Sequence, residues 1–182
     1  QGHSAIAVME NGGKGKVTYL SYGPESAGKP MHREFKNNAE FSKFLAESTY
    51  GDQPKQGSGF NYDEVVVLKT NEAQDKAVIT AGKEEVDKKR WALFGNLFGG
   101  ELNDADVNCK DMCRNALGAA GIPLPNRMKP NNWQDEVVSK TTRDRNKPLE
   151  GQLQNVLDAR NAALKSERQP VSPGPDAQYI AP

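Results

Sequence analysis

The sequence predicts an α+β fold in which a small antiparallel sheet packs against helices. Two β-rich runs joined by a glycine-rich turn open the chain, and most later segments place apolar residues at helical spacing. At 182 residues the chain has the length of one domain that buries a single core. We therefore expect one domain over residues 1–182, with residues 126–182 as its C-terminal helical extension.

Composition limits the classes of protein to which the chain can belong. Lysine plus arginine equals aspartate plus glutamate at 24 each, so no net charge favours nucleic acid or an anionic membrane. No run approaches the ~18 apolar residues of a membrane span, and the first residues lack the layout of a signal peptide. A start at Gln1, closely followed by a strand, is typical of a segment cut from a longer polypeptide.

Residues 4–9 and 16–22 predict a β-hairpin. The ENGGKG run between them contains Asn and Gly residues, which tolerate the positive φ of a tight connection. This run lacks the GxxxxGK[ST] spacing of a phosphate loop and leads into a strand, so we interpret it as the hairpin tip. A polar loop that contains His32 is expected over residues 23–36.

Two helices and a buried strand are expected between residues 37 and 90. Phe41, Phe44 and Leu45 recur at helical spacing behind an Asn cap and predict a short helix over 37–49. The consecutive apolar residues 65–68 predict a strand covered on both faces. A capping-box pattern at residues 71–74 predicts the start of a long helix that continues to about residue 90.

The second half of the chain is expected to be mostly helical. The NDAD run at 103–106 supplies candidate caps for a helix that carries Cys109 and ends at GIPLP, residues 121–125. A short helix is expected over 132–142, and a leucine-rich stripe predicts a longer one over 149–164. The aromatic run at 91–100 is expected in the core, and the segment 169–182 is expected to be irregular.

The chain has two cysteines and two histidines, which are its candidate nucleophilic, basic and metal-ligating side chains. Cys109 and Cys113 lie four residues apart in a helical pattern, a spacing that suits a disulfide poorly, so both are interpreted as thiols and Cys113 as a core residue. This set of ligands matches no zinc spacing, so no metal or cofactor is expected. His3 opens a strand, whereas His32 is expected to be exposed.

Cys109 has two interpretations. A free cysteine is often buried and inert. In the first turn of a helix, however, the helix dipole favours the thiolate, and the unpaired backbone N–H groups can hold an oxyanion. An imidazole on a neighbouring strand, such as that of His3, can then act as the base. This pairing has the geometry of a cysteine hydrolase.

A resemblance over residues 2–125 is carried by the GHSAIAV strand, the glycine-rich turn, the VTYLSYGP strand and the NC that heads a helix ending in AAGIPLP. These motifs resemble the circularly permuted papain-like hydrolases related to the NlpC/P60 superfamily, in which the histidine strand precedes the cysteine helix. The resemblance implies a papain-like fold with Cys109 as nucleophile and His3 as general base. It places the residue that orients the imidazole at Ser21, where serine replaces the usual His, Asn, Gln or acid. Tyr22 and His32 compete for that role.

The resemblance also implies a function. Related enzymes include peptidoglycan amidases and endopeptidases, lipid acyltransferases and deamidases, and several are toxic effectors secreted between bacteria. We expect a cysteine hydrolase that cleaves an amide bond in peptidoglycan as an antibacterial effector. Its delivery from the producer's cytoplasm would use a machine such as the type VI secretion system, and a cognate immunity protein is expected.

Two alternatives remain open at this point. The same fold serves lipid esterases, acyltransferases and protein deamidases. A non-enzymatic interaction module that binds through the 149–164 helix is the alternative from a different class.

Overall fold

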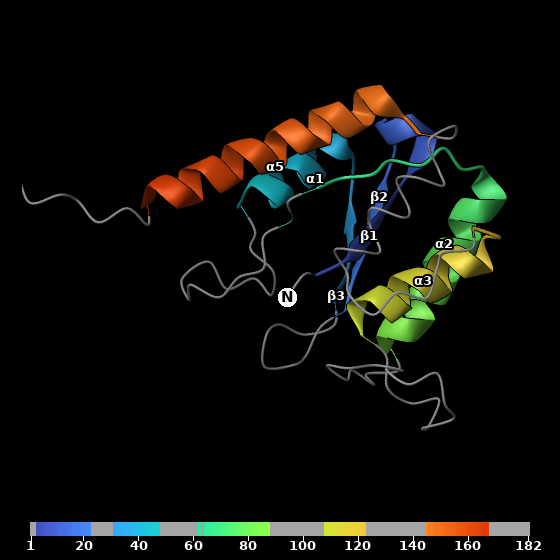
Figure 1. Cartoon of the computed structure of the whole chain (residues 1–182). Coiled ribbons are helices and arrows are strands. Elements are labelled where there is room, and N and C mark those ends of the chain that lie inside the picture. Colours follow the sequence, from blue (N-terminus) through green and yellow to red (C-terminus); the bar gives the residue numbers. More distant parts are fainter. Residues whose placement is uncertain are drawn as a thin grey trace, which may run out of the picture.

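The structure is a computed structural model that describes residues 3–22, 31–47, 62, 64–87, 108–122 and 145–167. Over these residues the chain is α+β, as predicted, with a three-stranded antiparallel sheet and four α-helices (Figure 1). The strands are β1 (Ala5–Met9), β2 (Val17–Ser21) and β3 (Met31–Phe35), and the helices are α1 (Asn38–Glu47), α2 (Glu72–Asp87), α3 (Cys109–Ala119) and α5 (Lys147–Glu167). None of these helices combines the length and the apolar character that crossing a bilayer requires.

The β1–β2 hairpin confirms the first prediction. β1 pairs with β2 in antiparallel register, from Ala5 opposite Ser21 to Met9 opposite Val17. The connection contains a short 3-10 turn (Glu10–Gly13), in which Asn11 has a φ of 52° and Gly12 a φ of 65°. Asn and Gly accept this left-handed conformation at low cost, as the ENGGKG pattern predicts.

The prediction of a loop around His32 was wrong. Residues 31–35 form β3, which pairs antiparallel with β2 and places His32 opposite Leu20. The strand lies at the edge of the sheet, and of the described side chains in it only Phe35 is buried. Because charged side chains fill its exposed positions, the strand lacks the apolar alternation by which a strand is recognised. His32 is exposed, as expected.

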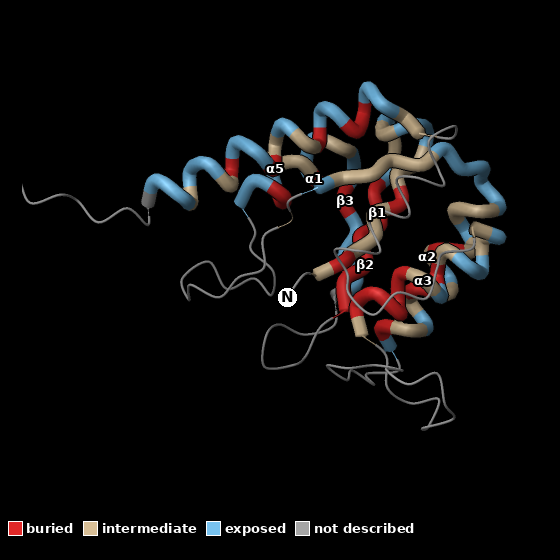
Figure 2. Tube along the Cα trace, viewed as in Figure 1, coloured by how far each residue is buried: buried red, intermediate tan, exposed pale blue. Residues whose placement is uncertain are grey.

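The sheet has a layer of helices on each face (Figure 2). On one face, the aromatic side chains of α1 and the leucines of α5 pack on Val17, Tyr19 and Phe35. On the other face, α2 and α3 cover Leu20 and Tyr22, as well as residues of β1. Successive residues of a strand point to opposite faces, so odd-numbered residues of β2 face α1 and α5 and even-numbered ones face α2 and α3.

The predicted strand at 65–68 is extended but does not join the sheet. Its backbone forms one isolated bridge, between Leu68 and Arg145. Side chains of α5 accept hydrogen bonds from it instead: the N–H of Val65 donates to Gln154, and the N–H of Val67 donates to Glu150. Since a helix satisfies these backbone groups, the apolar run needs no neighbouring strand.

Helices α1, α2, α3 and α5 lie where helices were predicted, although α5 extends a few residues beyond the predicted 149–164 at each end. Asn37 caps α1, and the Asn71–Gln74 capping box opens α2. The cap of α3 is Asn108 rather than a residue of the NDAD run: its side chain accepts from the N–H of Asp111 in a reciprocal capping box. The expectations for 91–100, 132–142 and 169–182 lie outside the described residues.

Candidate functional site

The imidazole of His3 and the hydroxyl of Ser21 are in direct contact. Nε2 of His3 lies 2.9 Å from Oγ of Ser21, a hydrogen bond between the first residue described in the chain and the end of β2. The register of the hairpin causes this contact, because Ser21 pairs with Ala5, two residues after His3 on the same face of the strand. The two residues that the resemblance assigns to the base and its orienting partner therefore meet.

Burial keeps the His3 ring neutral. Desolvation lowers the pKa of His3 from 6.5 to about 3. The ring of Tyr62 contributes to this burial, with its centroid 5.8 Å from the centroid of the imidazole. At neutral pH the ring is thus an unprotonated base.

Behind Ser21 lies a pair of tyrosines that the sequence analysis did not identify. The hydroxyls of Tyr62 and Tyr19 are 2.6 Å apart. Asn161 on α5 donates to the backbone carbonyl of Tyr62 at 3.0 Å. Tyr62 is separated from β1 by more than fifty positions and carries no motif, so only the fold reveals its role.

Cys109 occupies the first position of α3, as predicted. Asn108 caps the helix in an extended conformation, and the Cys109 side chain is 8% exposed. Backbone groups of Ser4, Lys110 and Cys109 itself lie close enough to the sulfur to lower the pKa of the thiol. Ser4 follows His3 directly, so these contacts place the sulfur beside the start of β1.

The expectation that the helix dipole makes Cys109 a thiolate is not met in the resting protein. Burial raises the pKa of the Cys109 thiol, and the Asp111 carboxylate adds to the increase; the backbone groups oppose both but do not outweigh them. Desolvation disfavours the charged form more than a few dipoles favour it. In the resting protein both the Cys109 thiol and the His3 imidazole are therefore neutral.

The side chains of His3 and Cys109 approach the end of β1 from different sides. His3 contacts Ser21 and Tyr62 on the face covered by α1 and α5, whereas α3 packs on the opposite face. The structure thus joins His3 with Ser21 directly, and joins Cys109 with Ser4, the neighbour of His3.

The two competitors for the orienting role lie elsewhere. Tyr22 is fully buried on the α2 and α3 face, where it packs with Met112 and Cys113. His32 lies on β3 and pairs with Glu34 at 3.7 Å.

Cys113 is fully buried, and burial raises its pKa well above the usual value, so the expectation of a core residue agrees with the structure. Cys109 and Cys113 are both free thiols.

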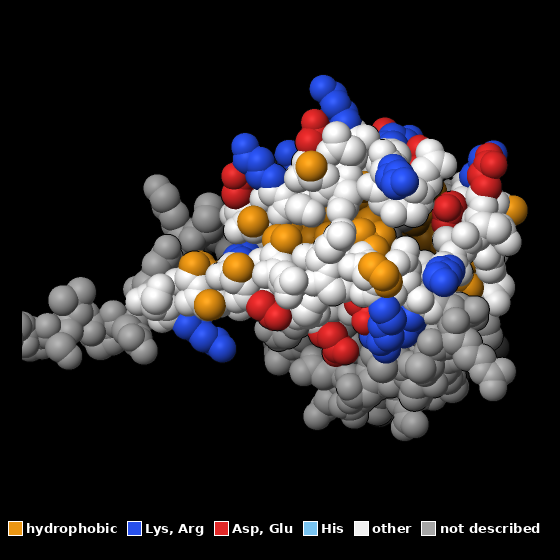
Figure 3. Space-filling model, turned by 90° about the horizontal axis from the view of Figure 1, so that it is seen from above, with side chains coloured by type: hydrophobic (Ala, Val, Ile, Leu, Met, Phe, Trp, Pro, Cys, Tyr) orange, Lys and Arg blue, Asp and Glu red, His pale blue; other side chains and the backbone are white. Residues whose placement is uncertain are grey.

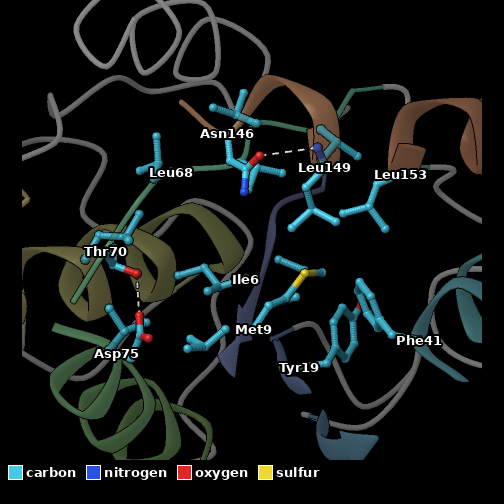
Figure 4. Close-up of a pocket in the computed structure, with 18 of the residues that line it drawn as sticks. Ile6, Met9, Tyr19, Phe41, Leu68, Thr70, Asp75, Asn146, Leu149 and Leu153 are labelled. Atoms are coloured by element: carbon cyan, nitrogen blue, oxygen red, sulfur yellow. Dashed lines mark hydrogen bonds between the residues drawn. The ribbon is translucent and has the colours of Figure 1, made fainter. Parts of the chain in front are cut away.

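A cavity of about 860 Å³ adjoins His3. Residues 3–12 line it along the outer edge of β1, together with the 64–70 segment and the leucines of α5. In Figure 4 the side chains of Met9, Tyr19, Phe41, Leu149 and Leu153 face one part of this space, and the hydrogen-bonded pair of Thr70 and Asp75 lies at another. Apolar side chains gather in a hollow of the face in Figure 3, with charged ones around it. The volume of the cavity beside His3 is within the range of small-molecule binding sites.

The described segments contain no group of three or more His, Cys, Asp or Glu side chains that could hold a metal ion. Comparison of the chain with protein-family models, with curated proteins and with solved structures gives no match.

Proposed function

We propose that the protein is a cysteine hydrolase with Cys109 as nucleophile, His3 as general base and Ser21 as the residue that orients the imidazole. The observation that supports it most is the 2.9 Å hydrogen bond between His3 and Ser21, in a fold that also places Cys109 at a capped helix start. A base held by a third group is the arrangement that nucleophilic catalysis requires.

The mechanism starts from neutral partners. Nε2 of His3 is engaged by Ser21, so Nδ1 accepts the proton of the Cys109 thiol. The sulfur then attacks the substrate carbonyl to form a tetrahedral oxyanion, which backbone N–H groups of the first turn of α3 stabilise. The leaving amine takes the proton from the imidazolium. In the second half of the reaction His3 accepts a proton from water, which attacks the acyl carbon. The sulfur then leaves and takes the proton from the imidazolium, so that thiol and imidazole return to their neutral forms.

The proposed substrate is an amide bond in cell-wall peptide, and the proposed role is that of an antibacterial effector. This role includes delivery from the producer's cytoplasm by a secretion machine and a cognate immunity protein. Its support is the order of the histidine strand and the cysteine helix along the chain, together with the motifs around them.

A lipid ester is the second candidate substrate, and one observation favours it. The cavity beside His3 is lined mainly by aliphatic and aromatic side chains, which suit an acyl chain. Purified peptidoglycan and phospholipid vesicles, each incubated with the protein, separate the two substrates by their products: released peptides or amines in one case, free fatty acid in the other.

Substitution of each cysteine in turn tests the proposal. Cys109→Ala is expected to abolish hydrolysis and toxicity, because it removes the nucleophile. Cys113→Ala is the matched control: it deletes the same sulfur one turn further along α3, in the core, and costs stability without removing the chemistry. Circular dichroism of both variants verifies the fold. Full activity of folded Cys109→Ala would overturn the proposal.

A further inference from the structure

The outer edge of β1 carries backbone groups that the sheet does not pair. The N–H of Glu10 donates to the carbonyl of Lys16, so the backbone groups of the even-numbered residues of β1 face β2. Those of the odd-numbered residues, Ala5, Ala7 and Met9, therefore point outward. No backbone group of the described segments hydrogen-bonds to them. Residues 3–12 line the cavity of about 860 Å³, so this polar edge forms one of its walls.

The two edges of the sheet differ in how they are protected. An open edge attracts other strands, and proteins commonly block it with charged side chains. The β3 edge follows this rule, since the consecutive residues His32, Arg33 and Glu34 occupy the strand. The β1 edge has the sequence AIAVM, with neither a charge nor a proline. It therefore accepts another extended chain, whereas the β3 edge is guarded.

The opposite wall of the cavity lies in the same layer as the sheet. Val65 and Val67 pack against the core cluster of α1 and α5, as the odd-numbered residues of β1 do. Val66 packs with Ile6 against the cluster of α2 and α3. The 64–70 segment and β1 line one cavity, which lies between them (Figure 4). The cavity thus occupies the place where a larger sheet would have its next strand.

A peptide strand suits this space better than an acyl chain or a second copy of the protein. Apolar side chains line the cavity from both helical layers, Tyr19 and Leu153 from one and Val78 and Leu117 from the other. Alternate side chains of a strand would all meet apolar partners there. An acyl chain would leave the backbone groups of β1 unpaired, which costs free energy. A second sheet would collide with the 64–70 segment, which closes the far side of the cavity.

We propose that the outer edge of β1 binds an extended, predominantly apolar peptide, which joins the sheet as a fourth strand between β1 and the 64–68 segment. Strand addition of this kind gains affinity from main-chain hydrogen bonds and specificity from alternate side chains. The binding itself requires no step of the proposed reaction. Its meaning as substrate binding rests on the proposed function, because a peptide aligned with β1 reaches His3 at the start of that strand.

Binding is measured with the Cys109→Ala protein, so that turnover does not consume the peptide. The probe is fluorescein-labelled KKVTVIVKK, whose five central residues match the five of β1 and whose lysines keep it in solution. We expect saturable binding by fluorescence anisotropy. Two forms, N-methylated at alternate amides in either register, each lack the donors along one edge. At least one of them is expected to bind about tenfold or more weakly.

Two results of this titration would overturn the proposal. Equal binding of all three peptides would show that main-chain donors are not used. Saturable binding of decanoic acid without binding of the peptide would identify the cavity as an acyl site.

Ala7→Pro, introduced into the same protein, tests the edge itself. Proline is tolerated on an edge strand where its missing N–H faces outward, so the pairing of β1 with β2 is retained. The variant is expected to bind the peptide about tenfold or more weakly, whereas the control Ala7→Ser keeps the N–H and should bind within about twofold of the parent. Unchanged binding by folded Ala7→Pro would contradict the proposal.

Amide hydrogen exchange provides the test if Ala7→Pro does not fold. The peptide is expected to slow the exchange of the Ala5, Ala7 and Met9 amides, while those of Ile6 and Val8 are already protected by β2. Unchanged exchange at all three outward amides in the presence of saturating peptide would overturn the proposal.

The outcomes separate this inference from the proposed function. If Cys109→Ala retains activity, the hydrolase fails, yet the peptide titration still decides the role of the β1 edge. If Cys109→Ala is inactive and binds no peptide, the hydrolase stands and the inference fails. A dimer that forms with increasing concentration and is lost in Ala7→Pro would identify a second copy as the occupant and contradict the inference.

Discussion

The site depends on the protonation of a single buried imidazole. His3 is held neutral by burial and hydrogen-bonded through Nε2, and its low pKa makes it a weaker proton acceptor than a solvated imidazole. A thiolate–imidazolium pair at rest would need the opposite shifts, a lower cysteine pKa and a higher histidine pKa. Substrate binding must therefore accompany the proton transfer in the proposed reaction.

Burial of the His3 imidazole should make the stability of the protein depend on pH. The pKa of His3 is about 3 in the folded protein and 6.5 when unfolded, so between these values the unfolded chain binds more protons. The free energy of unfolding should therefore fall as pH decreases from 6.5 towards 3, by at most about 1.4 kcal/mol per pH unit from this residue. Urea titrations of the wild type and His3→Gln at pH 7, 6, 5 and 4 measure the difference between their slopes. If the free energies of unfolding of the two proteins changed in parallel with pH, the low pKa of His3 would be contradicted.

At the residue scale, the sequence could predict part of the site. The resemblance implied Ser21 as the partner of His3, and the pairing of Ala5 with Ser21 in the hairpin brings the two side chains together. The sequence could not predict Tyr62, whose ring lies beside that of His3 and whose backbone carbonyl accepts a hydrogen bond from Asn161 on α5. Nor could it predict the pKa of Cys109, since burial by distant segments exceeds the local effect of the helix dipole.

At the scale of elements, the close contact of α2 with the sheet depends on a glycine. A Cβ at Gly82 would overlap Cδ1 of Leu20, a fully buried side chain with no room to move, and would lie 3.6 Å from Cβ of Ala116 on α3. The three elements β2, α2 and α3 therefore meet at one point, which fixes the position of the cysteine helix relative to the hairpin.

Gly82→Ala is expected to destabilise the protein by about 1 kcal/mol, because overpacking of about 1–3 kcal/mol exceeds a helix-propensity gain of about 1 kcal/mol. Gly151→Ala in α5 is the matched control, since a Cβ there meets nothing within 4 Å. It should stabilise the protein by roughly 0.5–1 kcal/mol. Chemical denaturation of both variants measures whether each substitution raises or lowers the free energy of unfolding. A Gly82→Ala variant that is more stable than the wild type would refute the close contact.

The elements were predictable where local signals agreed. The capping pairs at Asn37 and Asn71 and the positive φ of the hairpin tip follow from a few neighbouring residues. β3 was missed because its alternation is concealed by charges on an edge strand. The apolar run at 65–68 has the pattern of a sheet strand, and this pattern does not reveal that helix α5, rather than a strand, satisfies its backbone.

For the whole molecule, α5 is part of the core and not a free binding surface. Leu149, Leu153 and Leu157 are buried against the sheet and α1. The apolar stripe that motivated the interaction-module alternative is thus occupied within the chain itself. This helix also holds Tyr62, so it couples the C-terminal part of the fold to the candidate site.

Leu157→Ala should destabilise the protein by about 2–5 kcal/mol, the cost of a cavity at a site that is 1% exposed. Leu164→Ala, on the same helix and only half-buried, is the control and should cost clearly less. Unfolding midpoints in urea provide the comparison. Equal, small effects at both positions would mean that α5 does not contribute to the core.

The burial of the Cys109 thiol affects how readily the sulfur is oxidised. Peroxides attack the thiolate, and oxidation beyond the sulfenic acid is largely irreversible. A sulfur that is 8% exposed and mostly protonated offers little of the reactive form. The fold therefore shields the Cys109 sulfur, the proposed nucleophile, from oxidation in aerobic surroundings.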